Sequence, residues 1–300
     1  GRECQETELT HAVDMVLEAD GAVVAFTGAG VSAASGVPTY RDPGGLWTVY
    51  DQDKVSHIAG FLRKPLQCWR FEAELHRVLR RCEANVGHRA LAELERAGVL
   101  LGVVTQNVDG FHRAAGSEAV VELHGNETRA VCMNEDCQKR LPAVEVLRRL
   151  GWVDHGGAII EDALPDDGWI RLASSEEFDP TIPSDMALAM TGAHNGAPRC
   201  DACGALLKPD AVYFGEGLDE KTLLAARRMV GKARCMIVVG SNCSVAPAST
   251  LPISLKQRGG HLIEVNPRAS SISEIADVRI EGEAATILPK LSRAVLHLRS

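Results

Sequence analysis

After a short apolar run at 22–26, the chain reads Thr27-Gly28-Ala29-Gly30-Val31-Ser32-Ala33-Ala34-Ser35-Gly36-Val37-Pro38-Thr39-Tyr40-Arg41. The apolar run has the length of a buried strand. Gly28 and Gly30 carry no Cβ, so the backbone can turn tightly there and approach a ligand closely. We expect Ser32 and the small residues after it to open a helix, whose first free N–H groups suit a phosphate. The stretch therefore predicts the start of a dinucleotide-binding unit.

This stretch departs from the common dinucleotide fingerprint, G-x-G-x-x-G with an acidic residue about 20 positions later. The third glycine and a clear acidic ribose ligand are missing, which argues against a hydride-transferring dehydrogenase. The segment 36–47 is rich in Gly and Pro and is interpreted as a mobile flap over the cofactor, with Arg41 as a phosphate or ribose contact. The alternative is an ordinary strand-turn-helix that binds no ligand.

The composition narrows the class of protein. A length of 300 residues suits one large domain, or a large and a small one. The net charge of −8, with both signs interspersed, argues against a general nucleic-acid or membrane-surface binder. No apolar run reaches the length of a membrane span and no signal peptide is visible, although a start at Gly1 is consistent with trimming. We therefore expect a cytoplasmic protein without direct membrane or nucleic-acid partners.

Short apolar runs alternate with amphipathic segments, which predicts an α/β fold with a Rossmann-type, doubly wound parallel sheet. Helices are expected at 7–20, 55–82, 85–97, 219–231 and 284–298, and strands at 22–26, 100–105, 120–123, 235–239, 261–265 and 278–280.

Polar side chains follow two of these strands. Gln106, Asn107 and Asp109 come directly after 100–105, and His124 comes after 120–123. Ligands of open parallel sheets bind at the carboxyl ends of the strands, so these are candidate cofactor contacts. His124 is a candidate general base near neutral pH. The alternatives are that Asn107 or Asp109 only caps the next helix, and that His124 is a structural or surface histidine.

Two close cysteine pairs, Cys132 with Cys137 and Cys200 with Cys203, indicate a metal site in a reducing compartment such as the cytosol. Four thiolates suit tetrahedral Zn²⁺ and leave no position for water, so the metal would be structural. The pairs are far apart in the sequence, and we interpret the acidic stretch 154–185 between them as an insertion. The alternative is that the thiols bind no metal.

The motifs occur in one succession, GAGVSAASGVPTYR, TQNVDGFH, ELHG, the two cysteine pairs, KPDAVYFGE, VVGSN and EVNPR. Together they resemble the sirtuin (Sir2-like) family of NAD-dependent protein deacylases. The resemblance implies a large NAD-binding domain and a smaller zinc-binding domain, with NAD and acyl-lysine meeting in the cleft between them. The expected parts are 1–42, 85–128 and 209–300 for the large domain, 43–84 for a helical flap and small-domain segment, and 129–208 for the zinc-binding domain with a long insertion at about 138–199.

The resemblance also implies roles for single residues. His124 would be the catalytic base, and Asn107 and Asp109 would organise the ribose as nicotinamide leaves. NAD would be held by Gly28, Ala29, Gly30, Ser32, Arg41, Gln106, Asn107, Asp109, Gly240, Ser241, Asn242 and Asn266, the last on the adenine-side ribose. Zinc would be held by Cys132, Cys137, Cys200 and Cys203, and the substrate backbone would add as a strand to Val212, Phe214, Gly215 and Glu216.

The implied reaction yields nicotinamide, free lysine and O-acyl-ADP-ribose. The phosphate motif usually reads Gly-Thr-Ser, where this chain has Gly240-Ser241-Asn242, and we expect a modest effect. Family members that prefer acidic acyl groups carry Tyr and Arg where this chain has Glu72 and Leu75, which predicts a preference for neutral acyl groups. An NAD glycohydrolase or ADP-ribosyltransferase using the same pocket, and a non-catalytic zinc-ribbon adaptor, remain the alternatives.

Overall fold

The computed structural model describes residues 2–38, 48–172, 177–181 and 196–299. The chain forms two compact units, each described here by itself. Unit 1 is Gly1–Val37, Glu83–His124 and Leu218–Ser300, and unit 2 is Pro38–Cys82 and Gly125–Gly217. Residues 209–217, which the sequence analysis assigned to the large domain, thus fall in unit 2. The reason is that the strand at 207–211 pairs with the strand at 125–132.

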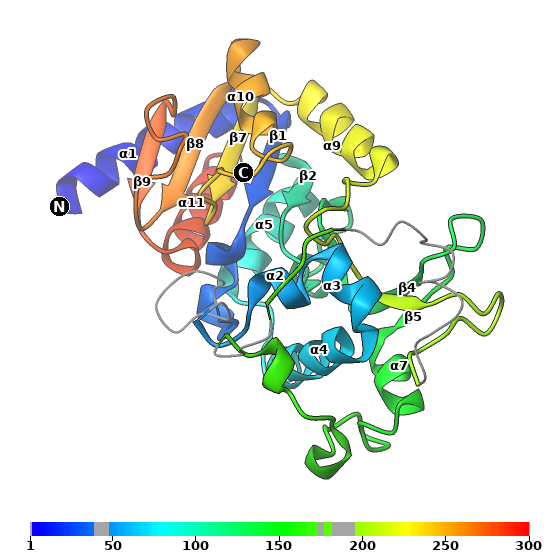
Figure 1. Ribbon diagram of the computed structural model, residues 1–300. Helices are drawn as coiled ribbons and strands as arrows, with labels where there is room; N and C mark the ends of the chain where they lie inside the picture. Colours follow the sequence, from blue (N-terminus) through cyan, green and yellow to red (C-terminus); the bar gives the residue numbers. More distant parts are fainter. Residues whose placement is uncertain (1, 39–47, 173–176, 182–195, 300) are drawn as a thin grey trace. The chain divides into compact units, whose positions relative to one another are not determined.

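Unit 1 contains a six-stranded parallel sheet in the order β3-β2-β1-β7-β8-β9 (Figure 1). Its strands are β1 (Val23–Thr27), β2 (Leu100–Thr105), β3 (Val120–Glu122), β7 (Cys235–Val239), β8 (His261–Asn266) and β9 (Val278–Glu281). β1 and β7 are buried at every position, and their residues are apolar except for Thr27 at the end of β1, as is typical of strands covered on both faces. The predicted α/β fold with a parallel sheet is confirmed.

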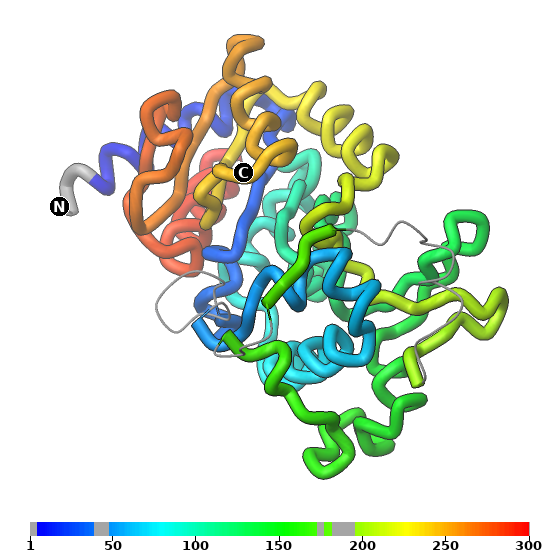
Figure 2. The backbone as a smooth tube through the Cα atoms, in the orientation of Figure 1, coloured from blue at the N-terminus to red at the C-terminus, as the bar shows by residue number. Residues whose placement is uncertain are grey.

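Helices cover both faces of this sheet. Val23 and Ala25 of β1 lie in the apolar cluster formed with α1, α5 and α11, whereas Val24 and Phe26 lie in the cluster formed with α9 and α10. α1 and α11 lie side by side although they stand at opposite ends of the chain (Figure 2). The helices are α1 (Arg2–Glu18), α5 (Val86–Arg96), α6 (Phe111–Ala114), α9 (Glu220–Lys232), α10 (Thr250–Gln257) and α11 (Ala284–Arg299).

Unit 2 combines helices with a three-stranded antiparallel sheet in the order β5-β4-β6. The fully buried Trp69 joins the two parts, because its indole N–H donates to the carbonyl oxygen of Leu207 at 2.9 Å. The elements are α2 (Gln52–Val55), α3 (Ile58–Arg63), α4 (Pro65–Leu79), β4 (Gly125–Cys132), β5 (Arg140–Pro142), α7 (Ala143–Arg149) and β6 (Leu207–Ala211).

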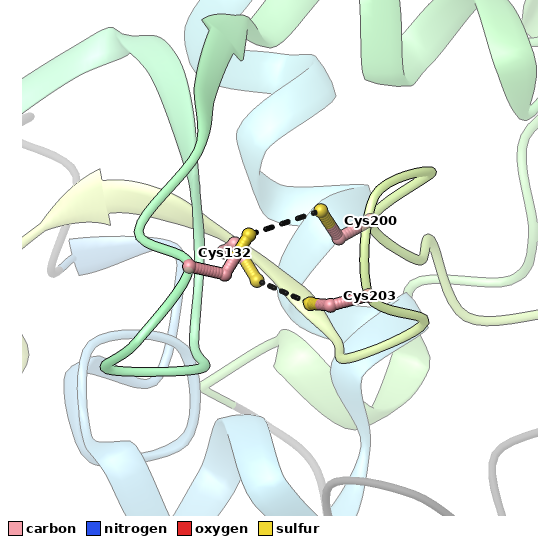
Figure 3. A group of neighbouring side chains, drawn as sticks. Cys132, Cys200 and Cys203 are labelled. Carbon is pink, nitrogen blue, oxygen red and sulfur yellow. Dashed lines mark hydrogen bonds between the residues drawn. The ribbon is translucent and has the colours of Figure 1, made fainter.

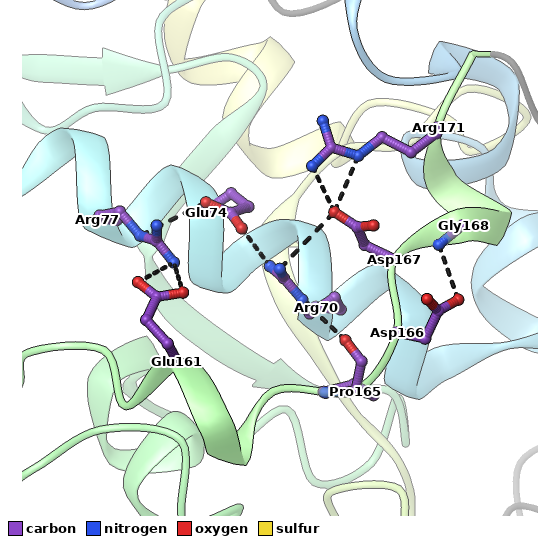
Figure 4. A network of polar contacts seen from close by, with 9 residues as sticks. All are labelled: Arg70, Glu74, Arg77, Glu161, Pro165, Asp166, Asp167, Gly168 and Arg171. Carbon is purple, nitrogen blue, oxygen red and sulfur yellow. Dashed lines mark hydrogen bonds and ion pairs between the residues drawn. The ribbon is translucent and has the colours of Figure 1, made fainter.

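The part of the insertion at 154–172 folds back onto α4 through charged groups (Figure 4). Arg70 forms an ion pair with Glu74 and lies 3.8 Å from a carboxyl oxygen of Asp167. Arg77 pairs with Glu161 at 2.8 Å, and Arg171 pairs with Asp167 at 2.5 Å. This described part of the acidic stretch is therefore anchored to the helix by ion pairs. Among the helices of the described residues, none is long and apolar enough to cross a membrane.

Candidate functional site

Two loops of unit 1 meet at the carboxyl ends of β1 and β7 through glycines. Gly30 donates its N–H to the carbonyl oxygen of Gly240 at 2.9 Å. A Cβ on Gly30 would lie 2.6 Å from the Cα of Gly240, and a Cβ on Gly28 would lie 2.8 Å from the Gly240 carbonyl oxygen. Gly240 itself has φ +59, a conformation that favours glycine. Gly28 and Gly30 are therefore required for the close packing of their loop against the loop that contains Gly240.

Within the described residues 2–38, no α-helix follows Ser32, which is the N-cap residue of a short 3₁₀ helix. The described part of this stretch contains two short 3₁₀ turns, η1 (Ala29–Val31) and η2 (Ala33–Ser35), instead. The Ser32 amide donates to Ala29, so it is not presented to a phosphate. The reason is that Ser32 is buried and turns its hydroxyl toward Asp109.

Ser32, Asn107 and Asp109 form one buried polar cluster at the ends of β1 and β2. The Ser32 hydroxyl donates to Asp109 Oδ2 at 2.6 Å and accepts from Asn107 Nδ2 at 3.1 Å. Asn107 also donates to the Gly28 carbonyl at 3.1 Å. Asp109 Oδ1 accepts the N–H of Phe111, the first residue of α6, at 2.9 Å, although the N-cap residue of this helix is Gly110. Burial raises the pKa of Asp109, while the hydrogen bond from Ser32 acts in the opposite direction.

Two buried histidines that the sequence analysis did not select lie beside this cluster. His88 Nε2 is 3.3 Å from the Ser32 hydroxyl, and His112 Nε2 is 2.8 Å from the Thr27 hydroxyl. Burial lowers their pKa values to about 4 and about 3, so both rings are neutral at pH 7. A polar His88 among the inward-facing residues of helix 85–97 was the signal available in the sequence.

His124 lies two residues after the end of β3, at the end of the second segment of unit 1, and is held by a backbone contact. Its Nδ1 lies 3.0 Å from the carbonyl oxygen of Gln106. Because a carbonyl can only accept, the neutral ring carries its proton on Nδ1 and its lone pair on Nε2. Burial lowers the pKa of His124, and the hydrogen bond to Gln106 opposes this shift. The ring is therefore a neutral base with Nε2 as the proton acceptor.

Hydrogen bonds around Ser241 order the loop after β7. The Ser241 hydroxyl accepts hydrogen bonds from Gln106 Nε2 at 2.7 Å and from the Cys243 N–H at 3.1 Å. The Cys243 thiol also lies 3.6 Å from this hydroxyl. With two N–H groups donating to its oxygen, the Ser241 hydroxyl keeps one proton that can be donated, as a phosphate oxygen requires. Asn266, at the end of β8, donates Nδ2 to the Ser241 carbonyl at 2.8 Å. These residues fit the phosphate and ribose part of a dinucleotide.

The structure thus brings together most of the cofactor-side residues expected from the sequence. Gly28, Gly30, Ser32, Gln106, Asn107, Asp109, Gly240, Ser241 and Asn266 are linked by the hydrogen bonds and close packing described above. Ala29 lies between Gly28 and Gly30 in the same turn, and Asn242 is exposed beside Ser241. Arg41 lies outside the described residues.

The expected substrate segment, 212–216, belongs to unit 2. Phe214 donates its N–H to Ser56 at 2.7 Å and accepts from the N–H of Ile58 at 2.9 Å, as a parallel bridge. Glu216 accepts from the N–H of Tyr213 at 2.7 Å. The edge facing 56–58 is therefore occupied, and a peptide strand would have to pair with the other edge. Val212 is half-buried, while Phe214 and Gly215 are exposed.

The four cysteines of the two pairs converge in unit 2. Figure 3 shows Cys132, Cys200 and Cys203 of this group. The sulfur atoms of Cys132 and Cys203 are 3.4 Å apart, and those of Cys137 and Cys200 are 3.8 Å apart. All four lie within 4.8 Å of one another. Four thiolates on a tetrahedral ion with bonds of about 2.3 Å are separated by about 3.8 Å. The set is therefore complete for a four-coordinate Zn²⁺, although it lacks an open position for catalysis.

Comparison with known proteins identifies relatives over almost the whole chain. The model of the family described as "Sir2 family" matches residues 28–247. The NAD-dependent protein deacylase of Thermococcus kodakarensis is 39% identical over 287 residues, which cover 96% of this chain and 95% of that protein. A Sir2 homologue solved with NAD is 33% identical, with a TM-score of 0.74 and coverage of 97% of this chain and 95% of the other. A Sir2 protein solved with a deacetylated p53 peptide and 3'-O-acetyl-ADP-ribose is 29% identical, with a TM-score of 0.73 and coverage of 97% and 98%.

Proposed function

Because the chain belongs to the Sir2 family and is an enzyme of the sirtuin type, an NAD-dependent protein deacylase, we propose that it transfers neutral acyl groups from protein lysines to NAD-derived ADP-ribose. The products are nicotinamide, free lysine and O-acyl-ADP-ribose, with one water consumed. The observation that carries this proposal is His124, whose Nδ1 is bound to the Gln106 carbonyl and whose Nε2 is left as a proton acceptor.

NAD is consumed as a co-substrate, and we assign roles in its binding and reaction to residues of unit 1. Ser241 is proposed to donate its hydroxyl proton to a phosphate oxygen, and Asn266, which donates to the Ser241 carbonyl, is proposed to contact the adenine-side ribose. Loss of nicotinamide makes the ribosyl carbon cationic, and Asn107 and Asp109 are proposed to orient the ribose and amide for this step. The acyl oxygen of lysine then attacks that carbon. His124 accepts a proton from a ribose hydroxyl, whose oxygen attacks the acyl carbon. The bond between the acyl carbon and the lysine nitrogen breaks, the amine leaves with a proton, and one water completes the ester of O-acyl-ADP-ribose.

The acid limb of the pH profile should lie below pH 6.5. The neutral His124 ring is the base, and burial lowers its pKa from the ordinary 6.5. Activity is therefore full at neutral pH and is lost only as the pH falls through this lowered pKa. The measurement is kcat/KM against pH with an acetyl-lysine peptide that has no titrating groups in this range. An acid limb centred at or above pH 6.5 would contradict the assignment.

We propose that Cys132, Cys137, Cys200 and Cys203 hold one structural zinc ion. The converging sulfur atoms and their four-thiolate chemistry support this. Such a site requires reduced cysteines, which supports the expectation of a cytosolic enzyme. The non-catalytic adaptor is disfavoured because it gives no reason for the ordered residues at the carboxyl ends of β1, β2 and β7.

The acyl preference rests on α4. Glu72 is buried, and burial raises its pKa, with the nearby Glu127 adding to the shift. Leu75 is 3% exposed and packs in an apolar cluster with Tyr50 and Phe71. Arg70 donates to the Pro165 carbonyl at 3.1 Å and pairs with Glu74 (Figure 4). None of these three residues therefore offers a free cation to an acidic acyl group.

We expect acetyl and butyryl lysine to be preferred over succinyl and glutaryl lysine by at least about tenfold in kcat/KM. A tenfold difference needs only about 1.4 kcal/mol, and a charge-assisted hydrogen bond is worth about 1.5–3 kcal/mol. The measurement compares the four acyl groups on one peptide. Arg70→Gln is the matched control and should leave the ratio unchanged. The opposite outcome is that the wild type turns over the acidic acyl groups equally well or better and that Arg70→Gln loses this activity. Arg70 would then be the residue that binds the acidic acyl group.

Nicotinamide release with and without acylated peptide separates the proposal from its rival on the same fold. A deacylase releases nicotinamide fast only when an acyl-lysine is present, because the acyl oxygen is the nucleophile. An NAD glycohydrolase or ADP-ribosyltransferase would release it equally without the peptide. Release that does not depend on the peptide would therefore favour the rival.

A further inference from the structure

Glu264 is a fully buried acidic residue in the middle of β8 that the proposed reaction does not use. It shares its face of the strand with Leu262 and Asn266, because side chains alternate along a strand. Leu262 lies in the apolar cluster that contains Ile272 and Cys243. A carboxyl group in such a layer is costly unless polar partners surround it.

Both carboxyl oxygens of Glu264 have such partners. Oε1 accepts the Ser270 hydroxyl at 2.5 Å, and Oε2 accepts the Ser273 hydroxyl at 2.6 Å. Arg279 on the neighbouring strand β9 lies 3.7 Å from Oε2. The two serines are also joined, because the Ser270 N–H donates to the Ser273 hydroxyl at 2.8 Å. Glu264 therefore ties the loop 270–273 to the sheet.

The same loop is tied to the proposed phosphate-binding loop. The Ser271 hydroxyl lies 2.6 Å from the carbonyl oxygen of Cys243 and 2.9 Å from that of Asn242, and these two oxygens share its one proton. Glu264 thus holds Ser270 and Ser273 by hydrogen bonds, and Ser271, which lies between them in the chain, is hydrogen-bonded to the loop after β7. All of these residues belong to unit 1.

Glu264 also acts directly on Asn266. The Asn266 amide nitrogen donates to the Ser241 carbonyl at 2.8 Å and lies 3.4 Å from Glu264 Oε1. An amide nitrogen has two N–H donors, and two acceptors are present for them. The amide oxygen, Oδ1, is therefore the atom left for a ligand, and it suits a hydroxyl group that donates.

We propose that Glu264 is a positioning residue for the adenine-side ribose of NAD. It orients the Asn266 amide so that Oδ1 accepts from a ribose hydroxyl, and through Ser270 and Ser273 it holds the adjoining loop in place. This inference rests on the proposed function, because it assigns a supporting residue to the same cofactor site.

Calorimetric titration with ADP-ribose tests this inference without any turnover. Glu264→Met keeps the length of the side chain in an apolar layer but removes every acceptor. We expect its Kd for ADP-ribose to be at least about tenfold above the wild-type value. Ser270→Ala combined with Ser273→Ala should weaken binding in the same direction, and this second variant carries the test if Glu264→Met does not fold.

Two further variants separate positioning from general loosening. Ser273→Thr retains the hydroxyl and should keep wild-type affinity. Ser254→Ala removes a partly buried hydroxyl of α10 that donates to Leu251 at 2.8 Å and should also bind normally. The Kd for an acetyl-lysine peptide should not change in Glu264→Met. Wild-type ADP-ribose affinity in Glu264→Met and in the double serine variant would overturn the inference, whereas no ADP-ribose binding by the wild type would overturn the proposed function itself.

Discussion

Replacing His124 by alanine is expected to lower the rate of acyl transfer by about 10²- to 10⁴-fold, the usual effect of losing a general base. The ring is fixed by its contact with the Gln106 carbonyl, so its Nε2 is presented as the proton acceptor. Alanine removes this acceptor without adding bulk or charge. The measurement is the single-turnover rate of O-acetyl-ADP-ribose formation from NAD and an acetyl-lysine peptide.

His11→Ala is the matched control, because His11 is an exposed histidine of α1 in the same unit. It should keep wild-type rates. The circular dichroism spectrum of His124→Ala should equal that of the wild type, since the side chain packs at the end of a strand and makes one described hydrogen bond. A folded His124→Ala protein with near wild-type turnover would remove His124 from the mechanism.

Replacing Cys200 by serine should remove the metal and unfold much of unit 2. The sulfur of Cys200 is 3.8 Å from that of Cys137, and all four cysteine sulfurs lie within 4.8 Å of one another. Structural zinc in zinc-finger peptides contributes about 10–16 kcal/mol of apparent binding free energy at pH 7, and this free energy drives folding. We expect one zinc per wild-type chain by elemental analysis, little in Cys200→Ser, and an added low-temperature unfolding transition in calorimetry.

Cys82→Ser provides the comparison, since Cys82 lies in unit 2 outside the four-cysteine group. It should retain one zinc and the wild-type unfolding profile. Freshly purified wild-type protein without zinc, or Cys200→Ser with an unchanged metal content, would show that the cysteines serve another purpose.

The parallel sheet could be predicted because its strands are buried on both faces. β2 and β7 were expected at 100–105 and 235–239 and have these bounds. Such strands are continuous apolar runs, and they end at polar residues that mark the ligand-binding edge. Asn107 and Asp109 were found in this way, from position alone.

Other features depend on contacts between distant segments and carry no local signal. A helix was expected to begin at Ser32. Its buried hydroxyl instead donates to Asp109, which is far away in the sequence. The segment 209–217 was assigned to the large domain. Its first residues, 209–211, belong to β6, which pairs with β4 of unit 2. The strand at 261–265 was expected, but nothing in it indicates that Glu264 is fully buried, because its partners Ser270 and Ser273 lie outside the strand.

Mass spectrometry of one reaction tests the central claim most directly. Wild-type protein is mixed with NAD and an acetyl-lysine peptide, and nicotinamide, free peptide and O-acetyl-ADP-ribose are quantified together. A deacylase that uses NAD as acyl acceptor forms the three products in equal amounts, and omission of the peptide stops nicotinamide release. Nicotinamide formed at the same rate without the peptide, with ADP-ribose or ADP-ribosylated protein as the other product, would contradict the account.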